Sequence, residues 1–205
     1  MRCFVALDLP APVRNHLADV IAPLRERFDV KWVAKDQLHL TLVFAGELPD
    51  DLVAPLADMV RHVELPPLSL SLSALGCFPP RGMPRVVWAG LSGDAEALGA
   101  LHADLSAAAE TLGVPRERRD FVPHVTLGRV KSQFGALALI DELKKGTERL
   151  KPKPFAPTAL VLYRSELRRA GPVHEPLVHR AVPAPPPQSP PRDPIDPAPD
   201  ARSPD

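Results

Sequence analysis

One short motif occurs twice in the chain, and it constrains the fold more than any other feature of the sequence. The first copy is Leu38-His39-Leu40-Thr41-Leu42 and the second is Pro123-His124-Val125-Thr126-Leu127. Both copies lie in apolar runs of the kind that forms β-strands. Because strand side chains alternate between two faces, the histidine and threonine of each copy point the same way. With 7 histidines in 205 residues, chance gives roughly 0.02 copies of His-x-Thr-Leu, so composition does not explain the repeat.

The charge and the cysteine content exclude several classes of protein. A length of 205 residues with a net charge of zero suits one domain or two small lobes, without a broad basic surface for long nucleic acid. A local basic pocket is compatible with that balance. Cys3 and Cys77 form neither a disulfide framework nor a pair with metal-ligand spacing, which fits a reduced, cytoplasmic setting. We expect no cofactor. No apolar stretch approaches the ~20 residues of a membrane span, and the first apolar run is too short for a signal peptide.

The remaining periodicity predicts a mixed order of strands and helices. Strands are expected at 4–9, 30–33, 37–45, 68–75, 86–91, 124–130, 155–164 and 173–182, and helices at 10–28, 51–63, 94–112 and 136–145. The strands and helices do not alternate regularly, which favours an α+β fold with antiparallel sheet. An internal duplication would give two similar lobes that face each other, and both His-Thr pairs would then meet in one cleft.

The composition changes abruptly at residue 183. Ten of the last 23 residues are proline, and such a segment cannot bury enough apolar surface to offset its ordering entropy. We therefore expect a domain over 1–182 and a disordered or polyproline tail over 183–205. A partner that reads Pro-rich sequence is one interpretation of the tail, and a solvated extension is the other.

Two histidines that face each other suit acid–base chemistry at a phosphorus centre. Imidazole titrates near ~6.5, so both protonation states are accessible at neutral pH. A neutral histidine can take a proton from an attacking water or hydroxyl while a protonated one gives a proton to the leaving oxygen. A threonine hydroxyl on the same face can donate to a phosphate oxygen. We predict His39 and His124 as the catalytic pair, with Thr41 and Thr126 as phosphate-binding residues.

Five residues beyond each histidine lies a further candidate, Phe44 in the first copy and Arg129 in the second. Phe44 could stack on a base and Arg129 could hold phosphate charge. Strict alternation, however, sends both side chains to the face opposite the histidines, where Phe44 would simply be core. A bulge after Gly128, or the end of the strand at that point, would re-aim Arg129.

Other basic residues have two interpretations. Arg116, Arg118 and Arg119 form a charge run that is either a solvated loop or a patch that steers RNA phosphates. His174 and His179, at the last expected strand, lie on the surface or line the cleft.

With these motifs in view, the sequence resembles the two-histidine (2H) phosphoesterases, and within them the LigT-like RNA 2′,3′-cyclic phosphodiesterases of bacteria and archaea. The resemblance covers residues 1–182 and leaves the tail outside. Several segments carry it in the family's order, namely 2–10, 32–33, 38–47, 84–90, 121–129 and 162–163.

The resemblance implies a bilobal α+β fold in which two pseudo-symmetric antiparallel sheets flank a central cleft, with helices outside and no metal. It implies opening of the 2′,3′-cyclic phosphate at an RNA 3′ end to leave a 2′-phosphate. It further implies that His39 is the acid for the O3′ leaving group and His124 is the base for water, although the symmetry of the motif leaves this assignment open.

Three functions remain at this point. The first is hydrolysis of RNA 2′,3′-cyclic phosphate. The second is the same chemistry on a small cyclic nucleotide, or ligation of RNA through a 2′-5′ linkage. The third is a non-catalytic module that binds RNA ends. We expect a monomer, because both halves of the site lie in one chain.

Overall fold

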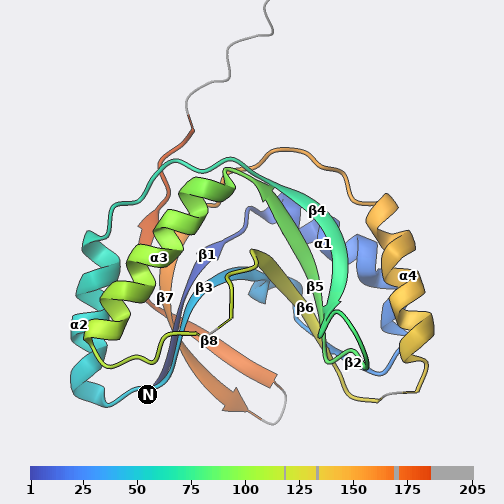
Figure 1. The fold of residues 1–205 in the computed structure, drawn as a ribbon, viewed down its shortest axis with the longest axis horizontal. Helices are drawn as coiled ribbons and strands as arrows, with labels where there is room; N and C mark the ends of the chain where they lie inside the picture. Colours follow the sequence, from blue (N-terminus) through green and yellow to red (C-terminus); the bar gives the residue numbers. More distant parts are fainter. Residues whose placement is uncertain (118, 133, 169–170, 186–205) are drawn as a thin grey trace, which may run out of the picture.

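The computed structural model describes residues 1–117, 119–132, 134–168 and 171–185, and these form an α+β fold (Figure 1). The strands in this part of the chain are β1 (Arg2–Asp8), β2 (Val30–Trp32), β3 (His39–Glu47), β4 (Leu70–Phe78), β5 (Val86–Gly93), β6 (His124–Val130), β7 (Ala159–Arg168) and β8 (Gly171–Ala181). The helices are α1 (Ala11–Arg25), α2 (Asp50–His62), α3 (Ala95–Thr111) and α4 (Ala136–Glu148), with a short 3-10 turn at Lys35–Gln37. No helix in these ranges is long and apolar enough to cross a membrane.

The strands of the described residues form a single antiparallel sheet with the order β4-β5-β6-β3-β1-β7-β8, and β2 pairs with β6. We expected two separate sheets. Instead, strand pairing joins the two halves of the sheet at one residue pair in the described chain, Leu40 opposite Val125. The reason is that β3 and β6 run side by side only at the start of each His-Thr motif and then diverge toward different partners, β1 and β5.

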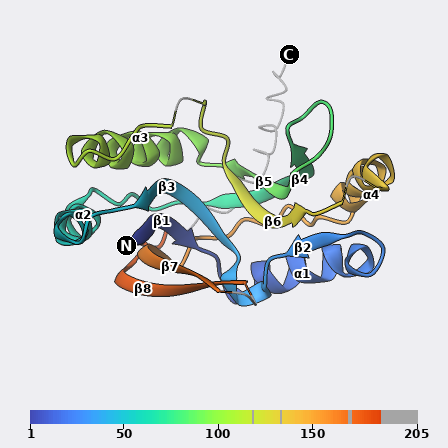
Figure 2. The same ribbon diagram turned by 90° about the horizontal axis from the view of Figure 1, so that it is seen from below.

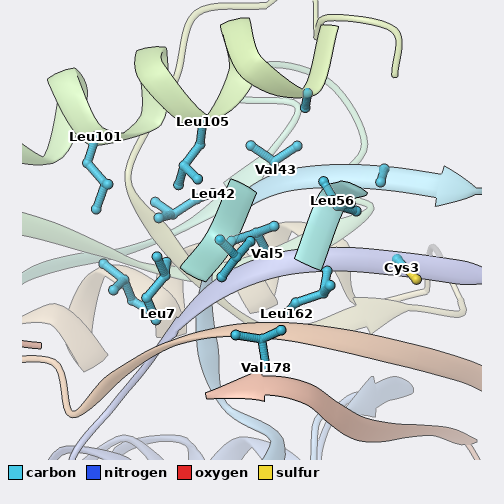
Figure 3. Close-up of a cluster of buried hydrophobic side chains, with 14 of the residues drawn as sticks. Cys3, Val5, Leu7, Leu42, Val43, Leu56, Leu101, Leu105, Leu162 and Val178 are labelled. Carbon is cyan, nitrogen blue, oxygen red and sulfur yellow. The ribbon is translucent and has the colours of Figure 1, made fainter. Parts of the chain in front are cut away.

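Each half of the sheet has its own helices and its own hydrophobic core. The first half contains β3, β1, β7 and β8, covered by α2 and α3, whereas the second half contains β4, β5, β6 and β2, covered by α1 and α4 (Figures 1 and 2). Figure 3 shows the core of the first half, in which Val5, Leu42 and Leu162 from three neighbouring strands meet Leu56 and Leu105 from the helices. The α+β class and its antiparallel pairing are therefore confirmed, as one continuous sheet.

Most element boundaries follow local sequence signals. Pro12 lies in the first turn of α1, where a missing N–H costs no hydrogen bond. Gly113 follows α3 with a φ of +82°, which suits a glycine at a helix end. The consecutive strands β4 and β5 pair as an antiparallel hairpin. Gly146, however, lies inside α4 rather than at its end. A Cβ there would come within 2.7 Å of the Leu75 side chain on β4, so glycine allows this close approach without a shift of that side chain.

The predicted tail at 183–205 falls almost entirely outside the described residues, since the description ends at residue 185.

Candidate active site

The two His-Thr motifs lie next to each other on β3 and β6. Leu40 pairs with Val125 in an antiparallel ladder, so its register sets His39 beside Thr126 and Thr41 beside His124. Leu40 and Val125 are fully buried, whereas the histidines and threonines are partly exposed on the other face. The backbone therefore brings two imidazoles and two hydroxyls together from segments 85 residues apart.

Both histidines are held in the same way. His39 Nδ1 lies 2.8 Å from the Gln37 carbonyl oxygen, and His124 Nδ1 lies 2.7 Å from the Val122 carbonyl oxygen. A carbonyl oxygen only accepts, so Nδ1 must carry the hydrogen and donate it in each case. The Nε2 atoms make no hydrogen bond within the described residues. Each Nε2 is thus the nitrogen that can gain or lose a proton toward a ligand.

An aromatic pocket surrounds His39. The ring of Phe4 stacks on it with centroids 4.8 Å apart, and His174 meets it edge-on at 5.7 Å. Tyr163 also stacks on Phe4, at 5.2 Å, and its ring lies 6.2 Å from that of His39. Tyr163 donates its hydroxyl to Asp8 Oδ1 at 2.7 Å, which fixes its position. Burial in this pocket raises the pKa of Tyr163, and its bond to Asp8 acts in the same direction.

The same burial lowers the pKa of His39 to about 4. The Gln37 carbonyl bond and the Asp8 carboxylate oppose this effect, whereas the nearby His174 and His124 add to it. The dominant cause is the loss of water around the charged ring. His39 is therefore neutral at pH 7 when no anion is bound.

His124 is supported by a second set of aromatic rings. Phe78 meets it edge-on at 5.1 Å, and Trp88 lies behind it at 6.5 Å. The Trp88 ring packs directly against Gly76. A Cβ at that position would come within 2.4 Å of the ring, so glycine is required there. The two histidines thus have similar backbone anchors and different aromatic supports.

A cavity of about 810 Å³ opens over this face of the sheet. Its lining includes His39, Thr41, Thr126, Phe44 and Arg129, five of the six residues predicted from the sequence. The sixth residue, His124, is not among the lining residues, although its charge acts on the pKa of His39. A cavity of this size lies within the usual ~300–1,000 Å³ range of small-ligand sites.

Two bulges explain why Phe44 and Arg129 face the cavity. In β3, Thr41 pairs with Ala6 of β1 and Val43 pairs with Val5. Leu42, which lies between them, is therefore an extra residue without a partner on β1. In β6, Trp88 pairs with Thr126 and Val87 pairs with Gly128, so Leu127 is the extra residue. The bulge thus precedes Gly128 rather than following it as expected. Each bulge falls on the leucine of His-x-Thr-Leu and reverses the alternation beyond it.

Three cations around the cavity form no ion pair with a carboxylate of the described residues. They are Arg2, Lys31 and Arg129, whereas Arg168, which also lines the cavity, is paired with Glu166 at 2.8 Å. Although the chain is neutral overall, these three cations give the cavity a local positive charge. Such a field favours an anionic ligand.

Several lining residues carried no recognisable signal in the sequence. Phe4 and Arg2 share the cavity face of β1, but Phe4 was indistinguishable there from a core residue. His174, weighed as one of two alternatives, does line the cavity. Arg118, from the predicted charge run, lies outside the described residues. No group of three or more His, Cys, Asp or Glu side chains in the described ranges could hold a metal ion.

Comparison with known proteins identifies the family to which the chain belongs. A family model described as the 2′-5′ RNA ligase superfamily matches residues 10–169. The chain belongs to this superfamily. Among curated members, an RNA 2′,3′-cyclic phosphodiesterase of Thermotoga maritima is 31% identical over 182 residues, covering 86% of this chain and 93% of the relative. The corresponding protein of Methanocaldococcus jannaschii is 29% identical over 184 residues, covering 85% and 97%.

Solved structures of superfamily members have the same fold. A crystal structure of a Thermus thermophilus protein superposes with a TM-score of 0.74 at 28% identity, covering 89% of this chain and 98% of that one. E. coli LigT in its apo form gives 0.69 at 29% identity, covering 88% and 96%. LigT has also been solved in complex with 3′-AMP, NADP+, ATP and phosphate.

Proposed function

We propose that the protein hydrolyses the 2′,3′-cyclic phosphate at the 3′ end of RNA to a 2′-phosphate, by acid–base catalysis with two histidines and no metal. The observation that carries this proposal is the pair of Nε2 atoms, both without a hydrogen-bond partner among the described residues and both presented from one face of adjoining strands. The superfamily relatives named RNA 2′,3′-cyclic phosphodiesterase support the same reaction.

The proposed reaction needs one proton acceptor and one proton donor. His124 Nε2 takes a proton from water, whose oxygen forms a bond to phosphorus. The bond from phosphorus to O3′ breaks, and His39 Nε2 gives its proton to O3′, leaving a 3′-hydroxyl and a 2′-phosphate. Thr41 and Thr126 donate hydrogen bonds to the non-bridging oxygens, and Arg129 supplies a positive charge. Two proton transfers of ~10²–10⁴ each lower the barrier by about 5–11 kcal/mol.

The lowered pKa of His39 couples its protonation to substrate binding. A histidine that is neutral in the free protein cannot donate a proton, so His39 must gain one as the phosphate anion arrives. The negative charge next to Nε2 stabilises the imidazolium, which makes the acid available only when substrate is present.

A smaller substrate is the second candidate. The complexes of LigT with 3′-AMP and ATP favour a site that accepts single nucleotides, and a 2′-5′ ligation would run through the same groups. The third candidate, a non-catalytic module that binds RNA ends, is less favoured, because binding alone does not require two Nε2 atoms that are free to exchange protons. Both histidines belong to one chain, so the proposed active form is a monomer.

One set of assays tests this function. The purified protein is incubated in EDTA with an oligoribonucleotide ending in 2′,3′-cyclic phosphate, and separately with nucleoside 2′,3′-cyclic phosphates. Release of a 2′-phosphate product supports the proposal, whereas the absence of turnover on every substrate contradicts it. Turnover of mononucleotides alone selects the smaller substrate.

The roles of the two histidines are separable with a modified substrate. His39→Ala and His124→Ala should each lower kcat by at least about 10². Sulfur in place of the bridging O3′ leaves without a proton, so this analogue should rescue His39→Ala and not His124→Ala. Rescue of His124→Ala alone would reverse the assignment.

A further inference from the structure

A second cavity lies beside the first and shares one wall with it. Its volume is about 440 Å³, and it is lined by residues 42–46 of β3, by one face of α3 and by the loop at 114–117. Phe44 lines both cavities. The second cavity is therefore adjacent to the proposed catalytic site, with Phe44 between the two.

Phe44 is placed to stack on a base at this junction. Its side chain is 54% exposed, although it is a large apolar residue in the middle of a strand. The guanidinium of Arg2 lies over its ring, 4.8 Å from the centroid, and restricts its orientation. An exposed aromatic ring beside a cationic side chain is the usual platform for a single-stranded nucleotide, because every base has a π-face.

The backbone of β3 forms part of the second cavity. Five consecutive residues, 42–46, line it, although neighbouring side chains of a strand point to opposite faces. Their main-chain atoms must therefore reach the cavity. Beyond Leu40 no strand in the described chain pairs with the edge of β3 that faces away from β1, so N–H and C=O groups on that edge are open to a ligand.

The opposite wall has polar and charged residues, namely His102, Ser106, Arg116 and Glu117, beside the apolar Ala109, Val114 and Pro115. His102 Nε2 lies 3.3 Å from the Ser106 hydroxyl, and its ring stacks on Phe121 at 4.0 Å. The exposed Arg116 forms no ion pair with a carboxylate of the described residues, and its charge acts on His102, whose pKa is lowered mainly by burial. Glu117, in the same loop, is bridged to Arg119 at 3.2 Å. That bridge offsets part of its negative charge.

We propose that the second cavity binds the nucleotide on the 5′ side of the one that carries the cyclic phosphate. In this arrangement its base stacks on Phe44, Arg116 contacts the connecting phosphodiester, and the open edge of β3 hydrogen-bonds the base or ribose. His39 and Phe44 are five residues apart along β3, about 16 Å at ~3.3 Å per residue. That span accommodates more than one nucleotide. Resting on the proposed function, this inference identifies an RNA 3′ end, rather than a mononucleotide, as the preferred substrate.

The test compares two substrates and two variants. The substrates are a nucleoside 2′,3′-cyclic phosphate and a trinucleotide that ends in the same cyclic nucleoside. Arg116→Ala should lower kcat/KM for the trinucleotide about tenfold and leave the mononucleotide within twofold. For the trinucleotide it should also reduce the slope of log(kcat/KM) against log[salt] by ~0.7, the contribution of one phosphate contact on a single strand. Arg149→Ala is the matched control, because this exposed arginine at the end of α4 lines neither cavity.

The outcomes separate this inference from the proposed function. Equal kcat/KM of the wild-type protein on both substrates would overturn the inference, as would equal losses on both substrates in Arg116→Ala, or no loss. If neither substrate is turned over, the proposed function fails, but the site is still tested by the anisotropy of a labelled trinucleotide with a 2′-phosphate end. Arg116→Ala must then bind it more weakly than Arg149→Ala, and equal affinities would refute the site.

Discussion

An anion in the cavity should change the protonation of His39. In the free protein the pKa of this histidine is about 4, against an ordinary value of about 6.5. At ~1.36 kcal/mol per pH unit, burial therefore disfavours the imidazolium by about 3 kcal/mol. A unit negative charge ~4 Å from Nε2 at an effective dielectric constant of ~20 contributes about 4 kcal/mol in the opposite direction. The bound anion should thus restore the pKa of His39 to its ordinary range or above.

Sulfate is a suitable probe, because its charge is constant between pH 4 and 8 while it resembles phosphate. The affinity for sulfate should rise as the pH falls from about 6.5 toward 4, by up to about tenfold per unit, because binding takes up one proton. NMR titration of the imidazole resonances, with His39→Gln to assign the signal, measures the pKa with and without sulfate. Calorimetry in buffers of different ionisation enthalpy measures the proton uptake.

Two results would refute this reasoning. One is a pKa of His39 near 6.5 without ligand, which would mean that burial in the aromatic pocket does not penalise the charge. The other is an unchanged pKa with sulfate bound, which would place the anion away from Nε2. His62, exposed on α2, is the internal control and should not respond to sulfate. The lowered pKa of His39 also affects folding stability. Between pH 6.5 and 4 the unfolded chain binds a proton at His39 and the folded chain does not, so the free energy of unfolding falls as the pH falls through this range.

Three further predictions follow from the same geometry. Arg129→Ala should lower kcat/KM for cyclic phosphates about 10–100-fold through loss of a charged hydrogen bond, and a loss below twofold in steady-state assays would remove Arg129 from the site. Gly128→Ala should destabilise the fold by about 1–3 kcal/mol in urea denaturation, because its Cβ would come within 2.6 Å of Val30; unchanged stability would mean that β2 yields freely. Truncation after Val182 should leave kcat/KM within twofold, and a larger loss would show that the tail takes part in the site.

The sequence was sufficient for the central contact of the site. Alternation placed His39 and Thr41 on one face and Leu40 on the other, and the structure has them so. This inference worked because a strand has a strict period of two, which a local pattern reveals. The repeat of the motif then implied that two such faces meet.

The position of Phe44 and Arg129 could not be derived in the same way. Each depends on a bulge, and a bulge is a property of the register between two strands rather than of one strand. The sequence contains one local sign of the bulge in β3. Leu42 and Val43 are consecutive apolar residues, whereas strict alternation would place a polar residue next to Leu42. Leu127-Gly128 repeats that sign less clearly, because glycine carries no side chain.

The contacts that Phe4 and His174 make with His39 could not be derived from the sequence, for a different reason. Both come from strands in the first half of the sheet, and their contact with His39 depends on the order of β3, β1, β7 and β8. The strong shift in the pKa of His39 originates in that assembly. Local propensity contains no information on which strands become neighbours across the length of the chain.

The single pair that joins β3 to β6 has a mechanical consequence. If the two halves rotated relative to each other, the Leu40–Val125 rung would lie nearest the axis, because β3 and β6 pair nowhere else in the described chain. In such a rotation, displacement grows with distance from the axis. The rim of the cleft would widen to admit a bulky polymer end, while the imidazoles, one residue from the axis on either strand, would hardly change their separation. The placement of one rung would thereby separate access to the site from the alignment of its two histidines.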